Sequence, residues 1–189
     1  SMWDVGSGRP VEPPLPEPKK KDKNTVFLTA VFSHDGKRLA AGGENEGACI
    51  WDFETGETYA TGQQHTGKIW ALEFSPDGKL LASGSGDTTV VLWEAATGKP
   101  VSHLLTGHTL TVRSLAFSRD GSTLASGSLD MSVILWDVAT RTKMGLPLFR
   151  NLDSIRALAF SPENKLYSSS YYDDTVEWDL APSSIEERS

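Results

Sequence analysis

Residues 69–94 read IWALEFSPDGKLLASGSGDTTVVLWE, and residues 112–137 read VRSLAFSRDGSTLASGSLDMSVILWD. The two stretches align without a gap, and each ends on a tryptophan followed by an acidic residue, Trp93-Glu94 and Trp136-Asp137. A repeat with a fixed period determines the architecture of a chain, because each copy forms the same structural unit. The fold is therefore predicted from this repeat.

The same frame occurs four times along the 189 residues. Tryptophans 42 or 43 residues apart mark the end of each copy, at Trp51, Trp93, Trp136 and Trp178. Phenylalanines follow the same period, at Phe32, Phe74, Phe117 and Phe160. Together the four copies cover residues 24–182.

Each copy consists of short segments with strand character, separated by turn residues. Side chains in residues 69–74 alternate with a period of two, and Pro76-Asp77-Gly78 supplies glycine where a tight turn needs a positive φ. No apolar period of 3.6 persists over the roughly 10–12 residues that a helix needs. The sequence predicts an all-β chain with three or four strands per repeat.

These repeats resemble those of the WD40 family. The resemblance rests on the Trp-Asp pairs, on Gly107-His108 ahead of Trp136, and on Phe-Ser-Pro-Asp-Gly at residues 74–78. It implies four β-propeller blades, each a four-stranded sheet, packed face to face around a central channel.

The number of copies is smaller than the resemblance implies, because WD40 propellers usually have seven or eight blades. Three arrangements stay open: a segment of a longer chain, a half-ring completed by a second copy, and a closed four-bladed ring. A half-propeller completed by a second chain or by further repeats is our main expectation, since an open strip leaves its terminal sheets uncovered.

The amino-terminal segment aligns on the end of a repeat. Residues 3–11, WDVGSGRPV, match residues 93–101, WEAATGKPV, without a gap. Residues 1–23 are therefore predicted to be the tail of a preceding blade followed by a loop rich in Pro and Lys. Its residues 9–12 are expected to pair beside the strand of Trp178, in the same chain or in a partner's. Residues 24–182 form the four repeats, and residues 183–189 form a C-terminal tail.

Composition and charge exclude several classes of protein. With 25 acidic and 18 basic residues the net charge is −7, so no overall positive field attracts nucleic acid or an anionic membrane. The single cysteine, Cys49, excludes an internal disulfide and a multi-cysteine zinc site. We expect a cytoplasmic protein, with the nucleus as the alternative because of the lysine-rich run at residues 19–23.

Two repeats carry His, Ser and Asp at equivalent distances before the tryptophan. The two sets are His65, Ser85, Asp87 and Trp93, and His108, Ser128, Asp130 and Trp136. These residue types occur together in hydrolase triads, but two equivalent copies within a repeat indicate a structural role. The resemblance implies a buried chain of hydrogen bonds from Asp to His, to Ser and to the indole. The first and fourth copies depart from it, with Lys23 and Asn151 at the histidine position.

No constellation in the sequence predicts catalysis, a metal or a cofactor. The segment Gly62 to Ile69 is close to a phosphate-binding loop, but it ends without Ser or Thr and joins two strands. His34 and His103 have no partner at metal-ligand spacing. We therefore expect no enzyme activity, no catalytic residues, no metal and no cofactor.

Recognition of other proteins or peptides is the function that these observations favour, as a scaffold of WD40 type. The resemblance implies that the rim near the interblade loops and tight turns receives partner segments. Trp, Tyr and Arg dominate binding hot spots. The predicted contact residues are Trp70, Arg113, Leu129, Arg156, Tyr171 and Tyr172.

Two further roles are considered at this point. One is homodimerisation, in which two half-rings close an eight-bladed propeller. The alternative function is that of a regulatory or sensor WD40 segment in a larger multidomain signalling protein, for example a signalling ATPase. Nucleic acid and membranes are not expected partners.

Overall fold

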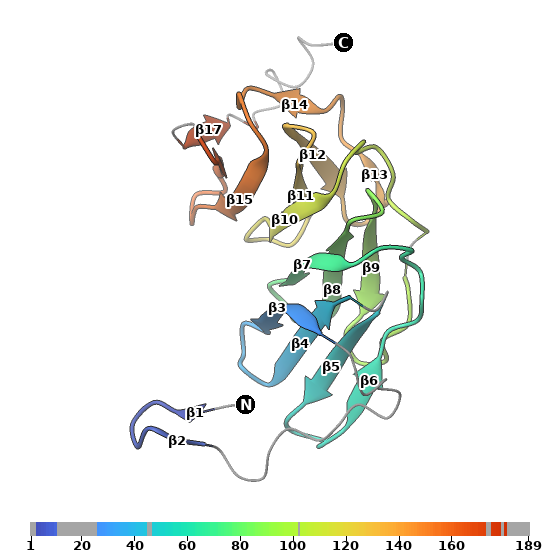
Figure 1. Ribbon diagram of the computed structural model, residues 1–189, viewed down its shortest axis with the longest axis vertical. Coiled ribbons are helices and arrows are strands. Elements are labelled where there is room, and N and C mark those ends of the chain that lie inside the picture. The colour runs from blue at the N-terminus through green and yellow to red at the C-terminus, as the bar shows by residue number, and fades with distance from the viewer. Residues whose placement is uncertain are drawn as a thin grey trace.

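A computed structural model describes residues 3–10, 26–44, 47–101, 103–172, 175–178 and 180. All regular structure in these ranges is β, as predicted from the repeat. The strands form one small hairpin and four larger antiparallel sheets, which are stacked in the order of the chain (Figure 1). The prediction of propeller-type blades is confirmed.

Each larger sheet takes its strands from one repeat. The first sheet consists of β3 (Phe27–Phe32), β4 (Arg38–Gly43), β5 (Ala48–Asp52) and β6 (Thr58–Ala60). The second consists of β7 (Ile69–Phe74), β8 (Leu80–Ser85) and β9 (Val90–Glu94). The third consists of β10 (Val112–Phe117), β11 (Thr123–Ser128), β12 (Ser132–Asp137), β13 (Thr142–Lys143) and β14 (Leu148–Phe149). The fourth consists of β15 (Ile155–Phe160), β16 (Leu166–Ser170) and β17 (Val176–Trp178).

The outer edge of the sheets is less regular than the inner three strands. In the second sheet it is reduced to two isolated bridges, Val90 with Leu105 and Trp93 with Pro100. In the third sheet β13 and β14 pair with opposite ends of β12. Three inner strands with a variable outer strand are therefore the common unit.

A separate hairpin, β1 (Trp3–Asp4) and β2 (Arg9–Pro10), stands where the sequence predicted the end of a blade. Trp3 pairs with Pro10, seven residues later, which is the register that Trp51 makes with Thr58. The hairpin lies at the first-sheet end of the molecule and β17 at the other (Figure 1), so β2 is not beside β17 within one chain. Residues 11–25 and 181–189, with most of the two predicted terminal segments, lie outside the described residues.

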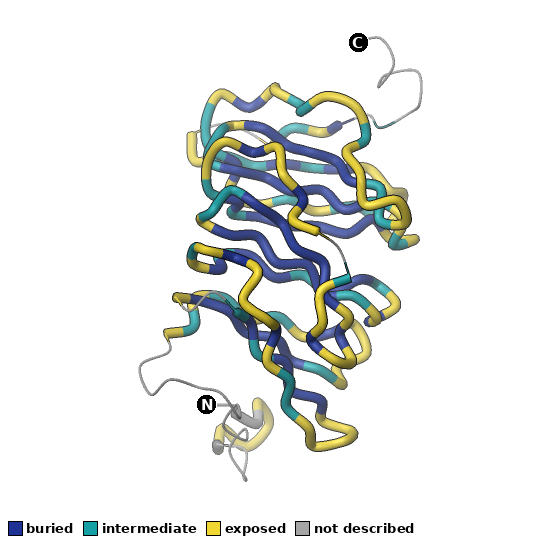
Figure 2. The backbone as a smooth tube through the Cα atoms, turned by 90° about the vertical axis from the view of Figure 1, so that its right-hand side faces the viewer, coloured by how far each residue is buried: buried dark blue, intermediate teal, exposed yellow. Residues whose placement is uncertain are grey.

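The core lies between successive sheets, where dark buried strands follow one another in Figure 2. One cross-strand pair in each of the first three sheets is turned toward the following sheet and is buried. These pairs are Ala40 with Ile50, Ala82 with Leu92 and Ala125 with Leu135. An alanine opposite a larger aliphatic residue gives a flat apolar face against which the next sheet packs.

A glycine in the second strand of each of these sheets permits this close approach. A Cβ added at Gly84 would lie 2.6 Å from Cγ1 of Val112 in the next sheet. Gly42 and Gly127 face Ile69 and Ile155 in the same way, with contacts of 2.8 and 2.4 Å. The glycines therefore act by leaving room for a β-branched side chain of the following sheet.

The fourth sheet differs on the corresponding face. Tyr167 and Glu177 replace the alanine and the aliphatic residue, and the Tyr167 hydroxyl donates to a Glu177 carboxylate oxygen at 2.8 Å. Lys165 forms an ion pair with Glu177, and Ser169 stands at the glycine position. This face of the fourth sheet is therefore polar, unlike the corresponding faces of the first three sheets.

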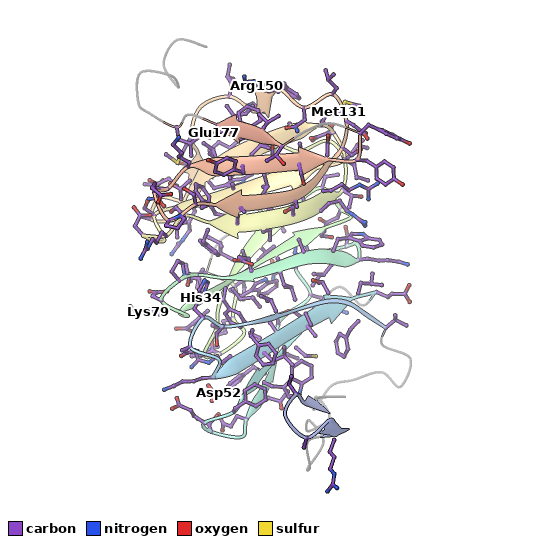
Figure 3. The ribbon with its side chains drawn as sticks, turned by 90° about the vertical axis from the view of Figure 1, so that its left-hand side faces the viewer. His34, Asp52, Lys79, Met131, Arg150 and Glu177 are labelled. Atoms are coloured by element: carbon purple, nitrogen blue, oxygen red, sulfur yellow. The ribbon has the colours of Figure 1, made fainter. Side chains whose placement is uncertain are left out.

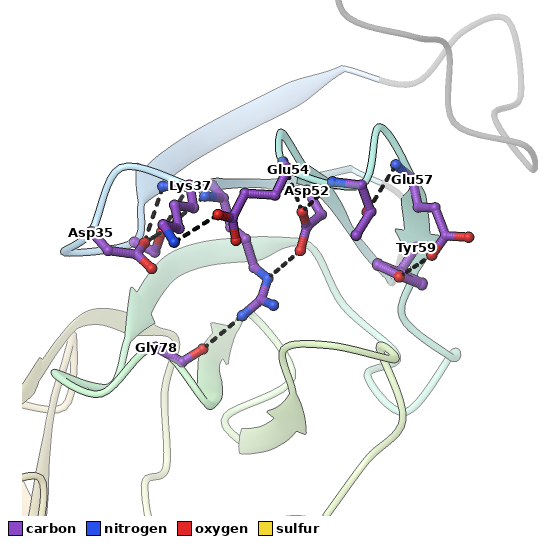
Figure 4. A network of polar contacts seen from close by, with 10 residues as sticks. Asp35, Lys37, Asp52, Glu54, Glu57, Tyr59 and Gly78 are labelled. Carbon is purple, nitrogen blue, oxygen red and sulfur yellow. Dashed lines mark hydrogen bonds and ion pairs between the residues drawn. The ribbon is translucent and has the colours of Figure 1, made fainter.

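Polar contacts add to the packing between the first and second sheets. Arg38 donates to a carboxylate oxygen of Asp52 at 2.8 Å and to the carbonyl of Gly78 in the second sheet at 3.2 Å (Figure 4). Asp52 is buried, and although burial acts to raise its pKa, the amides of Thr55 and Glu54 and the Arg38 guanidinium hold the pKa below its usual value. The contact connects β4 of the first sheet to the tight turn between β7 and β8 of the second sheet.

The four sheets form an open stack, with the first and fourth at opposite ends (Figure 1). A ring closed by these four blades is therefore not the arrangement that this structure shows. The first sheet turns Leu39, Ala41 and Trp51 away from the second sheet, so the two outward faces differ in polarity.

Substitution of Gly84 by Ala tests the packing role of the glycines. The added methyl would meet Val112, and overpacking of this kind costs about 1–3 kcal/mol in free energy of unfolding. Gly62→Ala is the control, because nothing lies within 4 Å of its Cβ position and its φ is not positive. Chemical denaturation measures both variants, and equal effects would contradict the proposed role of Gly84.

Candidate functional site

A β-bulge occurs near the start of the first strand of each of the four larger sheets. In the second sheet Ile69 pairs with Ser85 and Ala71 with Gly84, so Trp70 is the extra residue. Leu28, Arg113 and Arg156 are the extra residues in the other three sheets. Bulges re-aim a side chain and are frequent at functional edges. Three of the predicted contact residues therefore share a backbone feature that the sequence pattern did not reveal.

The bulges bring residues of different sheets together at one end of the strands, along one side of the stack. The guanidinium carbon of Arg113 in the third sheet lies 4.1 Å from the ring centroid of Trp70 in the second. Trp70 in turn lies against the tight turn after β8, where its Nε1 is 3.5 Å from the Cβ position of Gly86. Stacking of arginine on tryptophan is a favourable cation–π contact.

A second stacked group lies on the fourth sheet. The guanidinium carbon of Arg156 is 5.5 Å from the ring centroid of Tyr171, and Tyr171 packs edge to face on Tyr172 with centroids 4.8 Å apart. Tyr171 and Tyr172 are 66% and 83% exposed. Arg156 also acts on the Arg113 charge, so the two groups are electrostatic neighbours.

The tight turn after β11 lies at the same end of the strands. Leu129, the remaining predicted residue, is half-buried there, and its carbonyl accepts from the Ser154 hydroxyl at 3.4 Å. Met131 in the same turn is 44% exposed and lies at the opposite end of the strands from His34 and Lys79 (Figure 3). We call Trp70, Arg113, Leu129, Arg156, Tyr171 and Tyr172 the rim surface.

Beneath the rim, the second sheet contains a buried chain of hydrogen bonds. The Trp93 indole N–H donates to the Ser83 hydroxyl at 2.7 Å, and this hydroxyl lies 2.7 Å from Nε2 of His65. His65 Nδ1 is 3.0 Å from the Thr89 hydroxyl and 3.2 Å from Asp87. Because the ionised Asp87 carboxylate can only accept, we place the His65 proton on Nδ1, so that Nε2 accepts from the Ser83 hydroxyl.

The third sheet repeats this chain with closely similar distances. Trp136 donates to Ser126 at 2.8 Å, Ser126 lies 2.8 Å from Nε2 of His108, and His108 Nδ1 is 3.0 Å from Asp130. The aspartate also accepts from the Thr109 backbone amide at 2.8 Å, which fixes the connecting loop.

The prediction that Ser85 and Ser128 connect the histidine to the tryptophan was wrong, because the connecting serines lie two residues earlier in the strand. Ser83 and Ser126 hold the indole and the imidazole, whereas Ser85 and Ser128 accept from the amides of Asp87 and Asp130 at 3.1 Å. Residues two apart in a strand share a face, so the sequence pattern does not distinguish them. The tryptophan lies opposite Leu81 and its indole reaches the diagonal neighbour, Ser83.

Thr89 and Ser132 are members of the chain that the sequence analysis missed. Each hydroxyl donates to the neighbouring aspartate at 2.6 Å and lies within 3.1 Å of the histidine Nδ1. Both stand two residues after the aspartate in equivalent positions of the repeat. A hydroxyl residue two positions after the aspartate in both repeats was the sequence feature that could have predicted their role.

Burial sets the protonation of these groups. It lowers the pKa of His65 and of His108, against the opposing effect of Asp87 and Asp130, so the imidazoles stay neutral. Burial acts to raise the pKa of Asp87, but hydrogen bonds from Thr89 and Thr66 outweigh it and lower the pKa. Ser83 is fully buried and its hydroxyl is engaged on both sides, so it is not presented to a substrate.

The outer copies keep only parts of this chain. In the fourth sheet Trp178 donates to Ser168 at 2.8 Å and Ser168 donates to Asn151 Oδ1 at 2.7 Å. Asn151 Nδ2 is buried without a partner among the described residues, and Tyr172 stands at the aspartate position. In the first copy Ala41 occupies the serine position, and Lys23 and Asn45 lie outside the described residues.

The described part of the chain holds no group of three or more His, Cys, Asp or Glu side chains suited to a metal ion. It also contains no helix long and apolar enough to cross a membrane. Among the features described, the rim surface is the one that combines exposed aromatic side chains with stacked arginines.

Comparison with known proteins identifies the repeats that form the first three sheets. The family model described as WD domain, G-beta repeat, matches residues 21–52, 56–94 and 98–137, which together are more than half of the chain. A search of the curated proteins gave no match. The three matched segments end at the tryptophan-acidic pairs of the first three sheets.

Replacing Ser83 with Ala tests the corrected hydrogen-bond chain. The change leaves the Trp93 N–H and His65 Nε2 buried without their partner, which costs about 1–3 kcal/mol in free energy of unfolding. Ser122→Ala, at an exposed turn, is the control and should change stability by less than about 0.5 kcal/mol. Urea denaturation followed by tryptophan fluorescence measures both, and a Ser83→Ala variant as stable as the control would refute the assignment.

Proposed function

The chain belongs to the WD40 repeat family, and from this premise we propose that it recognises a segment of another protein through its rim surface. WD40 repeats support a protein-interaction scaffold at the general level. The rim surface, the type of partner and the assembly are the specific parts of the proposal.

One observation carries the proposal: arginine and aromatic side chains from three sheets meet at one end of the strands. Trp70, Arg113 and Arg156 are all bulge residues, and the exposed pair Tyr171 and Tyr172 extends the stack. Tyr, Trp and Arg contribute most of the energy in protein interfaces because each combines a large contact area with a polar group. A shared rim built from successive repeats suits a partner segment that crosses several blades.

Panning a random twelve-residue peptide display library tests this function without a known partner. We expect the wild-type protein to select peptides that the Tyr171→Ser, Tyr172→Ser double variant no longer retains, because two exposed aromatic contacts are lost. The control is His34→Ser, Lys79→Ser, at the opposite end of the strands (Figure 3), which should retain them. Binding is measured by fluorescence anisotropy on synthetic copies of the selected peptides.

Unchanged melting temperatures establish that both double variants are folded. Retention of the selected peptides by the rim variant and loss by the control would place binding elsewhere. Failure of the wild-type protein to select any peptide would contradict peptide recognition by this chain.

A second proposal concerns assembly into an eight-bladed ring by two copies. The open stack supports it. The outward face of the first sheet is apolar, but its Leu39, Ala41 and Trp51 are already buried within one chain and would have to be uncovered before a second copy could pack on them. A junction between the first sheet of one copy and the fourth sheet of the other would cover the polar pair Tyr167 and Glu177. Such a junction would thus be apolar on one side and polar on the other.

Light scattering on a sizing column tests this assembly. A closed pair of half-rings has twice the 20.5 kDa mass of the chain. Glu177→Arg should return the species to the monomer mass, because it would place positive charge beside Lys165 at the junction. A wild-type mass of one chain would refute the ring of two copies.

The alternative role, as a regulatory or sensor segment of a larger signalling protein, stays a prediction. It would use the same rim surface toward a segment of the same polypeptide or of a regulator. The panning experiment therefore applies to both roles, and the sequence of the full open reading frame distinguishes them.

A further inference from the structure

The two arginines of the rim surface carry charge that the described residues do not neutralise. Arg113 contacts Trp70 and Arg156 contacts Tyr171, and neither guanidinium has a hydrogen bond or ion pair with a described residue. In contrast, Arg38, at the opposite end of the strands, is paired with Asp52. Asp173 and Asp174 lie outside the described residues.

The aspartates of the tight turns after β8 and β11 are already engaged. Asp87 accepts from the amides of Thr66 and Thr89 and from the Thr89 hydroxyl, and it faces His65. Asp130 makes the equivalent contacts in the third sheet. These carboxylates stabilise the loops and form no hydrogen bond or ion pair with Arg113 or Arg156.

The surroundings of Arg113 favour an incoming anion. Arg113 is half-buried, and both burial and the nearby Arg156 charge lower its pKa. A carboxylate placed between the two arginines would compensate the cost of burying the Arg113 charge and would reduce its repulsion by Arg156. Arginine binds carboxylates through two parallel hydrogen bonds.

Apolar side chains lie at the same end of the strands as these two arginines. Leu110 and Met131 are 51% and 44% exposed, and Leu129 is half-buried in the same turn as Met131. Tyr171 and Tyr172 add aromatic surface beside Arg156. A ligand that fits must present an acidic group and apolar groups together.

We propose that the rim surface binds a partner segment in which an acidic side chain, held by Arg113 and Arg156, is flanked by apolar side chains. This inference rests on the proposed function and names the chemistry of the partner. Nucleic acid fits less well, because the described residues of the rim surface include two arginines and no lysine, and the chain carries a net charge of −7. Two guanidiniums match one or two carboxylates of a peptide.

The peptides selected in the display experiment provide the test, now read for their composition. We expect Asp or Glu next to apolar residues to be enriched among peptides selected by the wild-type protein. The enrichment should vanish for Arg113→Gln, Arg156→Gln and persist for the control Arg119→Gln, Arg141→Gln. The control removes the same charge at two exposed arginines in turns at the far end of the sheets.

The measured quantity is the dissociation constant of one selected peptide by fluorescence anisotropy. Replacing its acidic residue with Gln or Asn should weaken binding to the wild-type protein about tenfold, in line with the loss of one charge-assisted hydrogen-bonded pair. The same change should have no effect on binding to Arg113→Gln, Arg156→Gln. If that variant unfolds, Arg113→Lys, Arg156→Lys keeps the charge and should weaken binding while preserving the acidic preference.

The outcomes separate this inference from the proposed function. Selected peptides that depend on Tyr171 and Tyr172 but show no acidic enrichment would overturn the inference and leave the proposed function standing. Absence of any selected peptide would overturn both. Tighter binding of a twelve-nucleotide oligothymidine than of the selected peptides would overturn the inference in favour of a nucleic-acid partner.

Discussion

In the second and third sheets, one buried serine hydroxyl connects the loop before the sheet to its third strand, and the rest of the structure depends on this connection. It accepts from the tryptophan of the third strand and donates to the histidine of the preceding loop. The other ring nitrogen of the histidine is hydrogen-bonded to an aspartate in the tight turn, and that aspartate accepts a hydrogen bond from a backbone amide of the loop. Loop, tight turn and third strand are thereby held in one geometry, because each buried polar group has its partner within the chain.

The same end of each sheet carries the rim surface, so the buried chain and the exposed cluster are parts of one arrangement. The loop that contains His65 leads into Ile69 and the bulge at Trp70, and the loop that contains His108 leads into Val112 and the bulge at Arg113. A fixed loop entry gives the bulge residue a fixed direction. Packing between sheets, through Gly84 against Val112 and Gly127 against Ile155, then sets the distance from one rim residue to the next.

Much of this could be predicted from the sequence, because the repeat shows each feature more than once. The tryptophan period gave the four sheets, and the match of residues 3–11 to residues 93–101 anticipated the register of the first hairpin. The choice between Ser83 and Ser85 could not be made, since both share a strand face and only the reach of the indole separates them. The stacking of Arg113 on Trp70 depends on the spacing between sheets, and no pattern within one repeat contains it.

The central claim is that the serine–tryptophan hydrogen bond exists in the folded protein and is shielded from water. Hydrogen exchange of the indole N–H groups, followed by two-dimensional NMR, tests it directly. We predict slow exchange for Trp93, Trp136 and Trp178, whose indoles donate to buried serines, and fast exchange for Trp70 on the rim surface. Exchange of Trp93 and Trp136 at the rate of Trp70 would contradict the account.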